Sequence, residues 1–247
     1  MVNIVIPTYK RADKLVGRDY FHTGRFVLPE SQRDAYLRVL PIDRMIVIPD
    51  ECDGTIARKR NWILQNIERP LVMIDDDVRG IMHSEAGRQN IRLKPDVALD
   101  VIERTADLAA EWGCRLFGFN LNTDGINYQQ YKPFTLTQPV LGPFSGHLDH
   151  DILYDERMDL KEDYDMSLMH LARFRKVLRW NKFAYACEHG TNTGGIVAYR
   201  TIERERRACK AIMAKWGREI ISYKLDGPDV TMASLLNGRV RVPINGV

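Results

Sequence analysis

Three consecutive carboxylates follow a short apolar run in the first third of the chain. Asp75, Asp76 and Asp77 come directly after the residues Leu-Val-Met-Ile at 71–74. Such a run is typical of a buried strand, and adjacent negative charges at its end repel one another unless a cation or several donors neutralise them. Mg²⁺ and Mn²⁺ prefer oxygen ligands and commonly bind one or two carboxylates together with substrate phosphates. The Asp-x-Asp spacing of Asp75 and Asp77 therefore predicts a divalent-metal site for a diphosphate, with a plain acidic turn as the alternative.

A second acidic pair precedes a helical pattern about two thirds of the way along the chain. Glu162 and Asp163 stand at the start of a helix expected over residues 163–177. Carboxylates are favourable there because they interact with the positive end of the helix dipole, so capping alone can explain the pair. Beside a separate metal-binding set, however, one of them can accept a proton from an attacking hydroxyl as a general base.

The elements that must position these side chains alternate between strand and helix. The strand-like runs cover residues 3–8, 25–30, 45–50 and 71–74. Helical patterns at 31–40 and 55–67 separate them. This alternation predicts an α/β fold with a mostly parallel central sheet and flanking helices. Because ligands bind outside the carboxyl ends of parallel strands, Thr8, Glu30 and Asp50 should lie near the aspartates.

The rest of the chain continues the pattern with longer irregular stretches. We expect helices at 95–112 and 202–216 and strands at 115–120, 177–180 and 195–199. Residues 122–146 are rich in Gly, Pro, Gln, Tyr and Thr, which favours a long loop or hairpin of the kind that often binds substrates. No repeat or low-complexity segment divides the chain, so we predict a single domain over residues 1–247.

The composition of the chain is that of an ordinary globular protein. The 247 residues are 45% hydrophobic and 28% charged, with a formal net charge of +3, which is typical of a globular protein with one sizeable core. No apolar run approaches the roughly 20 residues of a membrane span, so we expect no membrane contact and a cytoplasmic location. The four cysteines lack the paired spacing of a zinc or redox motif and should be reduced. Basic runs at 58–60, 173–179 and 204–207 suit a polyanionic partner or solvated helix faces.

Several motifs taken together resemble a known family. In order along the chain, the sequence has Val-Ile-Pro-Thr-Tyr-Lys-Arg at 5–11, a stretch at 54–61 that ends in Arg-Asn, and the two acidic groups. This order is similar to that of family two GT-A glycosyltransferases. More narrowly, the motifs at 125–128, 143–147 and 160–168 resemble the TET-associated glycosyltransferases, which phages and their relatives encode beside DNA-oxidising enzymes. The resemblance extends over roughly residues 2–200.

The resemblance implies a role for each matching residue. It implies a GT-A fold, a nucleotide-sugar donor, Mn²⁺ or Mg²⁺, and Asp163, with Glu162 beside it, as the base of an inverting displacement. Asp77 is the implied main metal ligand, Asp75 is implied at the ribose or the metal, and His189 is either a further metal or phosphate ligand or a surface histidine. The implied nucleotide-sugar contacts are Thr8, Tyr9, Arg11, Glu30, Arg58, Arg60 and Asp76. Pro-Glu-Ser at 29–31 stands where many family two enzymes have Asp-Asp-Gly-Ser, so the nucleotide base stays open.

The narrower resemblance also implies an acceptor. It implies glucose transfer from a UDP-sugar to 5-hydroxymethylcytosine in phage DNA, in the cytoplasm of the infected host. Residues 1–120 would then bind the donor and residues 121–247 the acceptor, with Gly146, His147 and Trp180 around the acceptor base. A base in a duplex must be flipped out to react. The basic residues expected to track its phosphates are Lys161, Arg173, Arg175, Lys176 and Arg179.

Other functions fit parts of the pattern. A GT-A enzyme with a saccharide or lipid acceptor would keep the same donor site. Phosphatases with an Asp-x-Asp nucleophile usually carry it near the N-terminus before Gly-Thr, whereas Val-Arg follows Asp77. Sugar-nucleotide synthesis usually needs a Gly-rich basic loop, which residues 7–14 lack. A DNA-binding protein that keeps the fold without catalysis is the non-enzymatic alternative.

Overall fold

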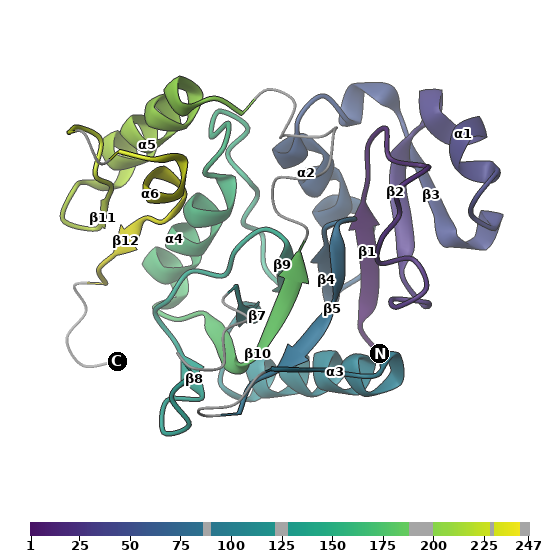
Figure 1. The fold of residues 1–247 in the computed structure, drawn as a ribbon, viewed down its shortest axis with the longest axis horizontal. Helices are drawn as coiled ribbons and strands as arrows, with labels where there is room; N and C mark the ends of the chain where they lie inside the picture. Colours follow the sequence, from purple (N-terminus) through teal and green to yellow (C-terminus); the bar gives the residue numbers. More distant parts are fainter. Residues whose placement is uncertain (86–89, 122–127, 188–199, 228–229, 243–247) are drawn as a thin grey trace.

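A mixed sheet of ten strands runs through the middle of the protein (Figure 1). The computed structural model describes residues 1–85, 90–121, 128–187, 200–227 and 230–242. The strands of this sheet are β1 (Asn3–Pro7), β2 (Arg25–Pro29), β3 (Met45–Ile48), β4 (Leu71–Ile74), β5 (Val78–His83), β6 (Ile91–Arg92), β7 (Leu116–Asn120), β8 (Phe134–Thr135), β9 (Phe144–His147) and β10 (Leu178–Cys187). Their order is β3-β2-β1-β4-β9-β7-β10-β5-β6, with β8 paired to β10.

Most strands of the sheet run in one direction. Only β9, β5 and β8 run against the others within the described part of the chain. The helices are α1 (Arg33–Leu37), α2 (Ile56–Asn66), α3 (Pro95–Glu111), α4 (Glu162–Phe174), α5 (Ile202–Trp216) and α6 (Met232–Leu236). Three short 3₁₀ turns, η1 (Glu30–Gln32), η2 (Ile42–Arg44) and η3 (Asp50–Cys52), adjoin β2 and β3. The predicted α/β architecture with mostly parallel strands and flanking helices is therefore confirmed.

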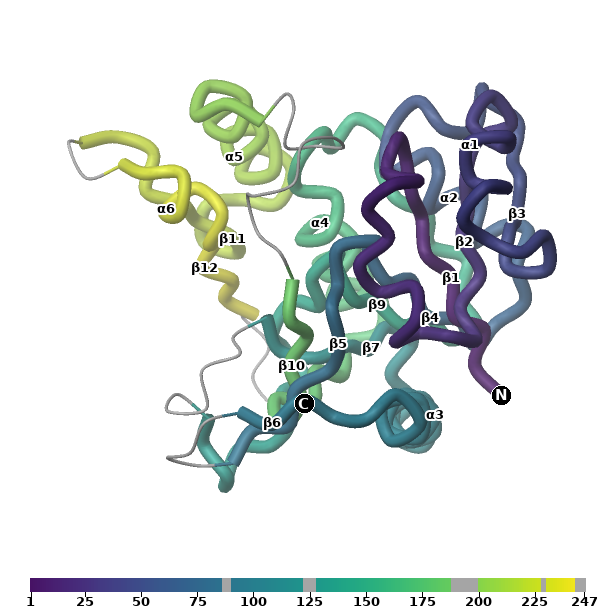
Figure 2. Tube along the Cα trace, turned by 45° about the vertical axis from the view of Figure 1, so that its right-hand side comes forward, coloured from purple at the N-terminus to yellow at the C-terminus, as the bar shows by residue number. Residues whose placement is uncertain are grey.

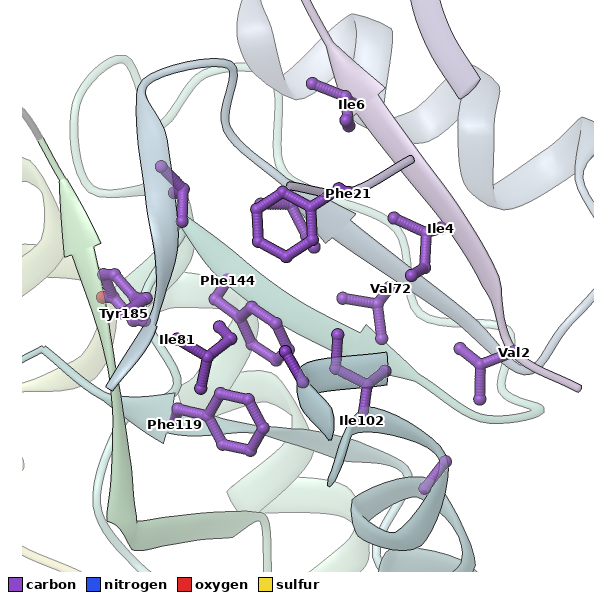
Figure 3. Packing of buried hydrophobic residues seen from close by; sticks show 14 of the residues in the cluster. Val2, Ile4, Ile6, Phe21, Val72, Ile81, Ile102, Phe119, Phe144 and Tyr185 are labelled. Carbon is purple, nitrogen blue, oxygen red and sulfur yellow. The ribbon is translucent and has the colours of Figure 1, made fainter. Parts of the chain in front are cut away.

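The two faces of the sheet carry separate apolar cores. Along β1, Ile4 and Ile6 belong to one core while Val5 belongs to the other, because successive side chains of a strand point to opposite faces. The first core contains the buried face of α3 together with Phe21 and Phe144, and Figure 3 shows these rings packed beside the strands. The second contains residues of α2, α4 and α5. The sheet is thereby covered on both sides, as parallel strands require.

Several predicted boundaries differ from the observed ones. The helix expected at 31–40 is only a 3₁₀ turn followed by α1, since Pro41 disfavours helical geometry in the residue before it. α4 ends at Phe174 rather than 177 because Arg175 adopts a left-handed φ of 67°. β5, with Gly80 in its middle, was not predicted. The strand expected at 195–199 lies outside the described residues.

The C-terminal segment forms a small layer beside α4. β11 (Ile221–Ser222) pairs with β12 (Arg239–Val240), and α5 packs against α6. Figures 1 and 2 both show this segment next to α4 and far from α1. Among the described helices, none is long and apolar enough to cross a membrane.

Candidate functional site

A cavity of about 700 Å³ opens where β1 and β4 end. Its walls come from the residues after these strands, from α2, from residues 141–143 before β9, and from the start of α4. β10, Arg200 and α6 close the far side. The cavity therefore lies at the carboxyl edge of the parallel strands, where ligands of α/β proteins usually bind.

The three aspartates make the turn between β4 and β5 and take different positions. Asp76 is buried and accepts hydrogen bonds from Thr8 Oγ1, at 2.7 Å, and from Arg11. Asp75 and Asp77 line the cavity, with 30% and 21% of their side chains exposed. Asp76 thus secures the turn, and the other two carboxylates face the ligand space.

Negative charge is concentrated at this turn. Burial, followed by the neighbouring charges of Asp75 and Asp76, raises the pKa of Asp77 to about 7. Burial also raises the pKa of Asp75. A divalent cation would relieve this repulsion, and two carboxylates plus ligand phosphates are a donor set that Mg²⁺ or Mn²⁺ accepts. The residues present therefore fit such an ion, although no group of three or more metal-ligating side chains occurs among the described residues.

Arg60 connects the aspartate turn to the start of α4. Its side chain is only 2% exposed and bonds to Asp75 Oδ1 at 3.1 Å, Glu162 Oε1 at 3.0 Å and the Gly142 carbonyl at 3.1 Å. Burial would lower the pKa of Arg60, but Asp75, Tyr154 and Glu162 raise it above its ordinary value. Arg60 is therefore a permanent buried cation between the two acidic groups.

Glu162 and Asp163 differ in what surrounds them. Glu162 is 6% exposed, and burial together with the charge of Asp163 raises its pKa to about 7. Asp163 is half-buried, lines the cavity, and accepts backbone N–H groups from Gly142 at 3.1 Å and Tyr164 at 2.7 Å. These donors hold its carboxylate in place beside the cavity, so Asp163 is the better placed of the two to contact a substrate hydroxyl.

Most of the predicted donor-binding residues reach this cavity. Thr8, Tyr9, Arg11, Arg60 and the aspartates all line it. Glu30 is exposed in η1 and is not among its described lining residues. Arg58 points elsewhere, to Glu156 at 3.1 Å, because it lies on the solvent side of α2. His189 lies outside the described residues, as do residues 125–127 of one family-like motif.

The three predicted acceptor-binding residues lie away from the cavity. Gly146 sits between neighbouring strands, where an added Cβ would be 2.1 Å from the ring of Phe117, so this glycine is needed for packing. His147 is fully buried and pairs with Leu71, at the end of β4 opposite Asp75. Trp180 packs against Phe134 and Phe183. Their side chains serve the interior of the fold in this structure.

His147 belongs to a buried cluster of three histidines. The Ile152 N–H donates to His150 Nδ1 at 3.2 Å, so the neutral ring carries its proton on Nε2 and donates it to His147 Nδ1 at 3.1 Å. The ring of His170 packs edge-on against that of His150, with centroids 4.5 Å apart. Burial, with added repulsion from neighbouring cations, lowers the pKa of His150 to about 3, and burial lowers that of His170 to about 4. The folded protein therefore holds these rings neutral.

Acidification should destabilise the protein through this cluster. In the unfolded chain these rings take up a proton near their ordinary pKa of 6.5, whereas in the folded chain they stay neutral to a much lower pH. The contribution of the neutral rings to the free energy of unfolding is therefore complete above about pH 6.5 and is lost as pH falls below it. His150 alone should account for about 2 kcal/mol between pH 7 and pH 5. Urea unfolding of wild type and His150→Gln across this range measures the effect. The variant should lose less stability on acidification, while His22→Gln, at a half-exposed ring, should behave as wild type.

The sequence did not predict that Lys59, Tyr185 and Arg200 line the cavity, and it placed Lys161 only on a phosphate-binding surface. Lys59 is buried and donates to the Thr8 carbonyl, and Lys161 bonds to Glu205 Oε2 at 2.8 Å. Arg200 contacts the same glutamate at 2.7 Å. The hydroxyl of Tyr185 is buried at the cavity wall without a hydrogen-bond partner among the described residues, so a donor is available to a ligand. Lys59 and Lys161 lie in sequence runs of charged residues that are typical of a surface. Only their contacts with residues far away in the sequence show that they are buried.

The family of the chain follows from comparison with known proteins. A family model described as TET-Associated Glycosyltransferase matches residues 2–195, which include every strand from β1 to β10 and every predicted site residue. A search of curated proteins returned no match. The matched segment also contains the aspartate turn, Arg60 and the start of α4 that form the cavity. The chain belongs to the TET-associated glycosyltransferase family.

Proposed function

We propose that this protein transfers glucose from a UDP-sugar to 5-hydroxymethylcytosine in phage DNA, with Mn²⁺ or Mg²⁺ at Asp75 and Asp77. Membership of the family makes the protein a glycosyltransferase that acts on modified DNA bases. The donor, the ion and the identity of the base are the proposal. The observation that carries it is that the Asp75–Asp77 pair and Asp163 line one cavity.

The donor would lie on the side of the cavity formed by β1 and β4. Its diphosphate would approach Asp75 and Asp77, where a bound ion supplies charge neutralisation for the leaving nucleoside diphosphate. Thr8, Tyr9 and Arg11 line the adjacent wall and offer a hydroxyl, an aromatic ring and a guanidinium to the nucleotide. The volume of about 700 Å³ is within the usual range for sites of this kind.

Asp163 would take the proton of the acceptor hydroxyl. Its carboxylate is oriented by the two backbone N–H donors, so the basic oxygen keeps its position as the hydroxymethyl group of the base approaches. Glu162 is held by Arg60 and is less available. Holding the two reactants in the correct geometry can lower the activation barrier by roughly 7 to 11 kcal/mol when the alignment is ideal.

One experiment tests donor and acceptor together. The protein is incubated with Mn²⁺, a set of nucleotide sugars, and DNA that contains 5-hydroxymethylcytosine, and the nucleosides are then analysed by mass. We expect one hexose on the modified cytosine and none on unmodified DNA. The proposal fails if sugar is transferred only to a saccharide or lipid, or if 5-hydroxymethyluracil is the only base that reacts.

A further inference from the structure

A second, smaller cleft lies between the segment before α4 and the helix α5. Its volume is about 340 Å³. Its described lining residues are Arg157, Met158, Asp159, Lys161, Arg204, Arg207, Ala208 and Ala211. Half of these residues are basic and one is acidic, so basic side chains dominate the lining.

One face of the helix α5 forms a wall of this cleft. Arg204, Arg207, Ala208 and Ala211 follow the spacing at which residues of a helix share a side. The two alanines are small and leave room between the arginines. Arg204 is held by Asp159, with Nη2 at 2.7 Å from Oδ1, which fixes the guanidinium at the wall of the cleft.

The basic side chains of the cleft differ in how far their charge is already neutralised. Lys161 is paired with the fully buried Glu205, and Arg204 with Asp159. Arg157 donates to both carboxylate oxygens of Asp155, each at 2.9 Å, but 86% of its side chain is exposed, so its remaining N–H donors face solvent. The side chain of Arg207 is exposed and makes no hydrogen bond or ion pair with any residue in the described ranges. Arg157 and Arg207 are therefore the two side chains able to bind an external anion.

Lys161 lines both the cleft and the large cavity, so the two spaces adjoin. Asp163 stands two residues further along, at the start of α4. A nucleotide whose base enters the large cavity keeps its phosphates outside, on the strand that continues past the entrance. We propose that this cleft binds the backbone phosphates of the acceptor DNA strand next to the target nucleotide, through Arg157 and Arg207. This inference rests on the proposed function.

Among its described lining residues, the cleft shares only Lys161 with the phosphate-binding surface expected from the sequence. Of the basic residues named for it, Lys161 is 2% exposed and Arg173 is paired with Asp151. Arg179 bonds to Asn181 within a partly buried site. The α5 wall of the cleft, in contrast, lies beyond residue 195, where the family match ends. The proposed site thus combines Arg157, inside the matched residues, with Arg207, from a segment that the family model does not include.

Binding measurements on the full chain test the cleft. The double variant Arg157→Ala/Arg207→Ala is compared with Arg33→Ala/Arg38→Ala, which removes the same charge from exposed positions around α1 at the other end of the sheet. Anisotropy with a labelled single strand containing 5-hydroxymethylcytosine is recorded as salt is varied. Each lost phosphate contact reduces the slope of log K against log salt by about 0.7, so the cleft variant should lose about 1.4 and bind about tenfold more weakly at low salt. The control should match wild type.

Each other outcome overturns the assignment. Wild-type affinity and slope in the cleft variant would show that the phosphates bind elsewhere. An increased KM for the nucleotide sugar with unchanged DNA binding would assign the cleft to the donor. If the wild-type protein neither binds nor glycosylates DNA, the proposed function itself fails. If the wild-type protein binds DNA and the cleft variant binds it equally well, only the assignment of the cleft fails.

Discussion

Replacing Arg60 by Met should destabilise the protein by about 3 to 5 kcal/mol, the usual cost of removing one partner from a buried charge group. Arg60 is 2% exposed and lies between Asp75 and Glu162. Without its guanidinium, the buried Glu162 and the partly exposed Asp75 lose their shared counter-charge, and the Gly142 carbonyl loses its donor. Met has similar volume, so the loss reports on charge rather than on a cavity.

Urea unfolding at neutral pH measures this loss. Arg104→Met on the exposed side of α3 removes the same side chain and should change stability by less than about 0.5 kcal/mol. Arg60→Met/Glu162→Gln should recover part of the stability, because one of the two uncompensated charges is then gone. If the double variant is no more stable than Arg60→Met, the carboxylates do not depend on Arg60 for their neutralisation.

The second large effect is expected at Asp77, where activity and stability should change in opposite directions. Asp77→Asn should lower the transfer rate by about 10² to 10³, the range found when one electrostatic contact to developing charge is removed. The same change should stabilise the metal-free protein by roughly 1 to 3 kcal/mol, because the wild-type carboxylate is ionised in a largely buried position and against the charges of Asp75 and Asp76.

The sign of the pH dependence follows from the raised pKa of Asp77. A carboxyl that titrates near 7 in the folded chain and near 3.8 in the unfolded chain favours folding at low pH and disfavours it as pH rises. The stability difference between Asp77→Asn and wild type should therefore be small near pH 4 and reach its maximum above pH 7. Unfolding curves for both proteins at several pH values, without added metal, give this difference directly.

Added Mn²⁺ separates the two consequences. It should raise the thermal midpoint of wild type and leave that of Asp77→Asn nearly unchanged, since a bound ligand stabilises only the state that binds it. Asp107→Asn, at an exposed position on α3, carries the same charge change and should respond to Mn²⁺ as wild type does. An equal Mn²⁺ response in Asp77→Asn would place the ion elsewhere.

Local patterns were sufficient to predict the elements that carry the site. The helices expected at 55–67 and 202–216 agree with α2 and α5, because Thr55 and Thr201 cap their first turns in the way their positions suggest. The apolar strand before Asp75 and the acidic start of α4 were also predicted, and the two acidic groups do meet in one cavity. In these cases the sequence signal and the structural cause lie within a few residues of each other.

Where partners are distant in sequence, prediction from the residues was weaker. A histidine in a strand gives no local sign of whether it faces a ligand or the interior, and His147 is buried because β9 lies between β4 and β7. Lys161 is buried only because Glu205 comes from α5. β5 was missed because Gly80 interrupts its strand-like pattern, although β5 pairs with β10 from Val78 to His83 with one register shift. The burial of these side chains and the pairing of this strand depend on which elements become neighbours, and that depends on the sequence of the whole chain.

The position of β9 has a consequence for biosynthesis. β9 lies between β4 and β7 and pairs with both, although it follows them in the chain. During synthesis, the facing edges of β4 and β7 therefore stay unpaired until residues 144–147 have left the ribosome. Such exposed edges are the part of a nascent sheet most prone to pairing with other chains. Translation must pass residue 147 before the aspartate turn after β4 gains its neighbouring wall.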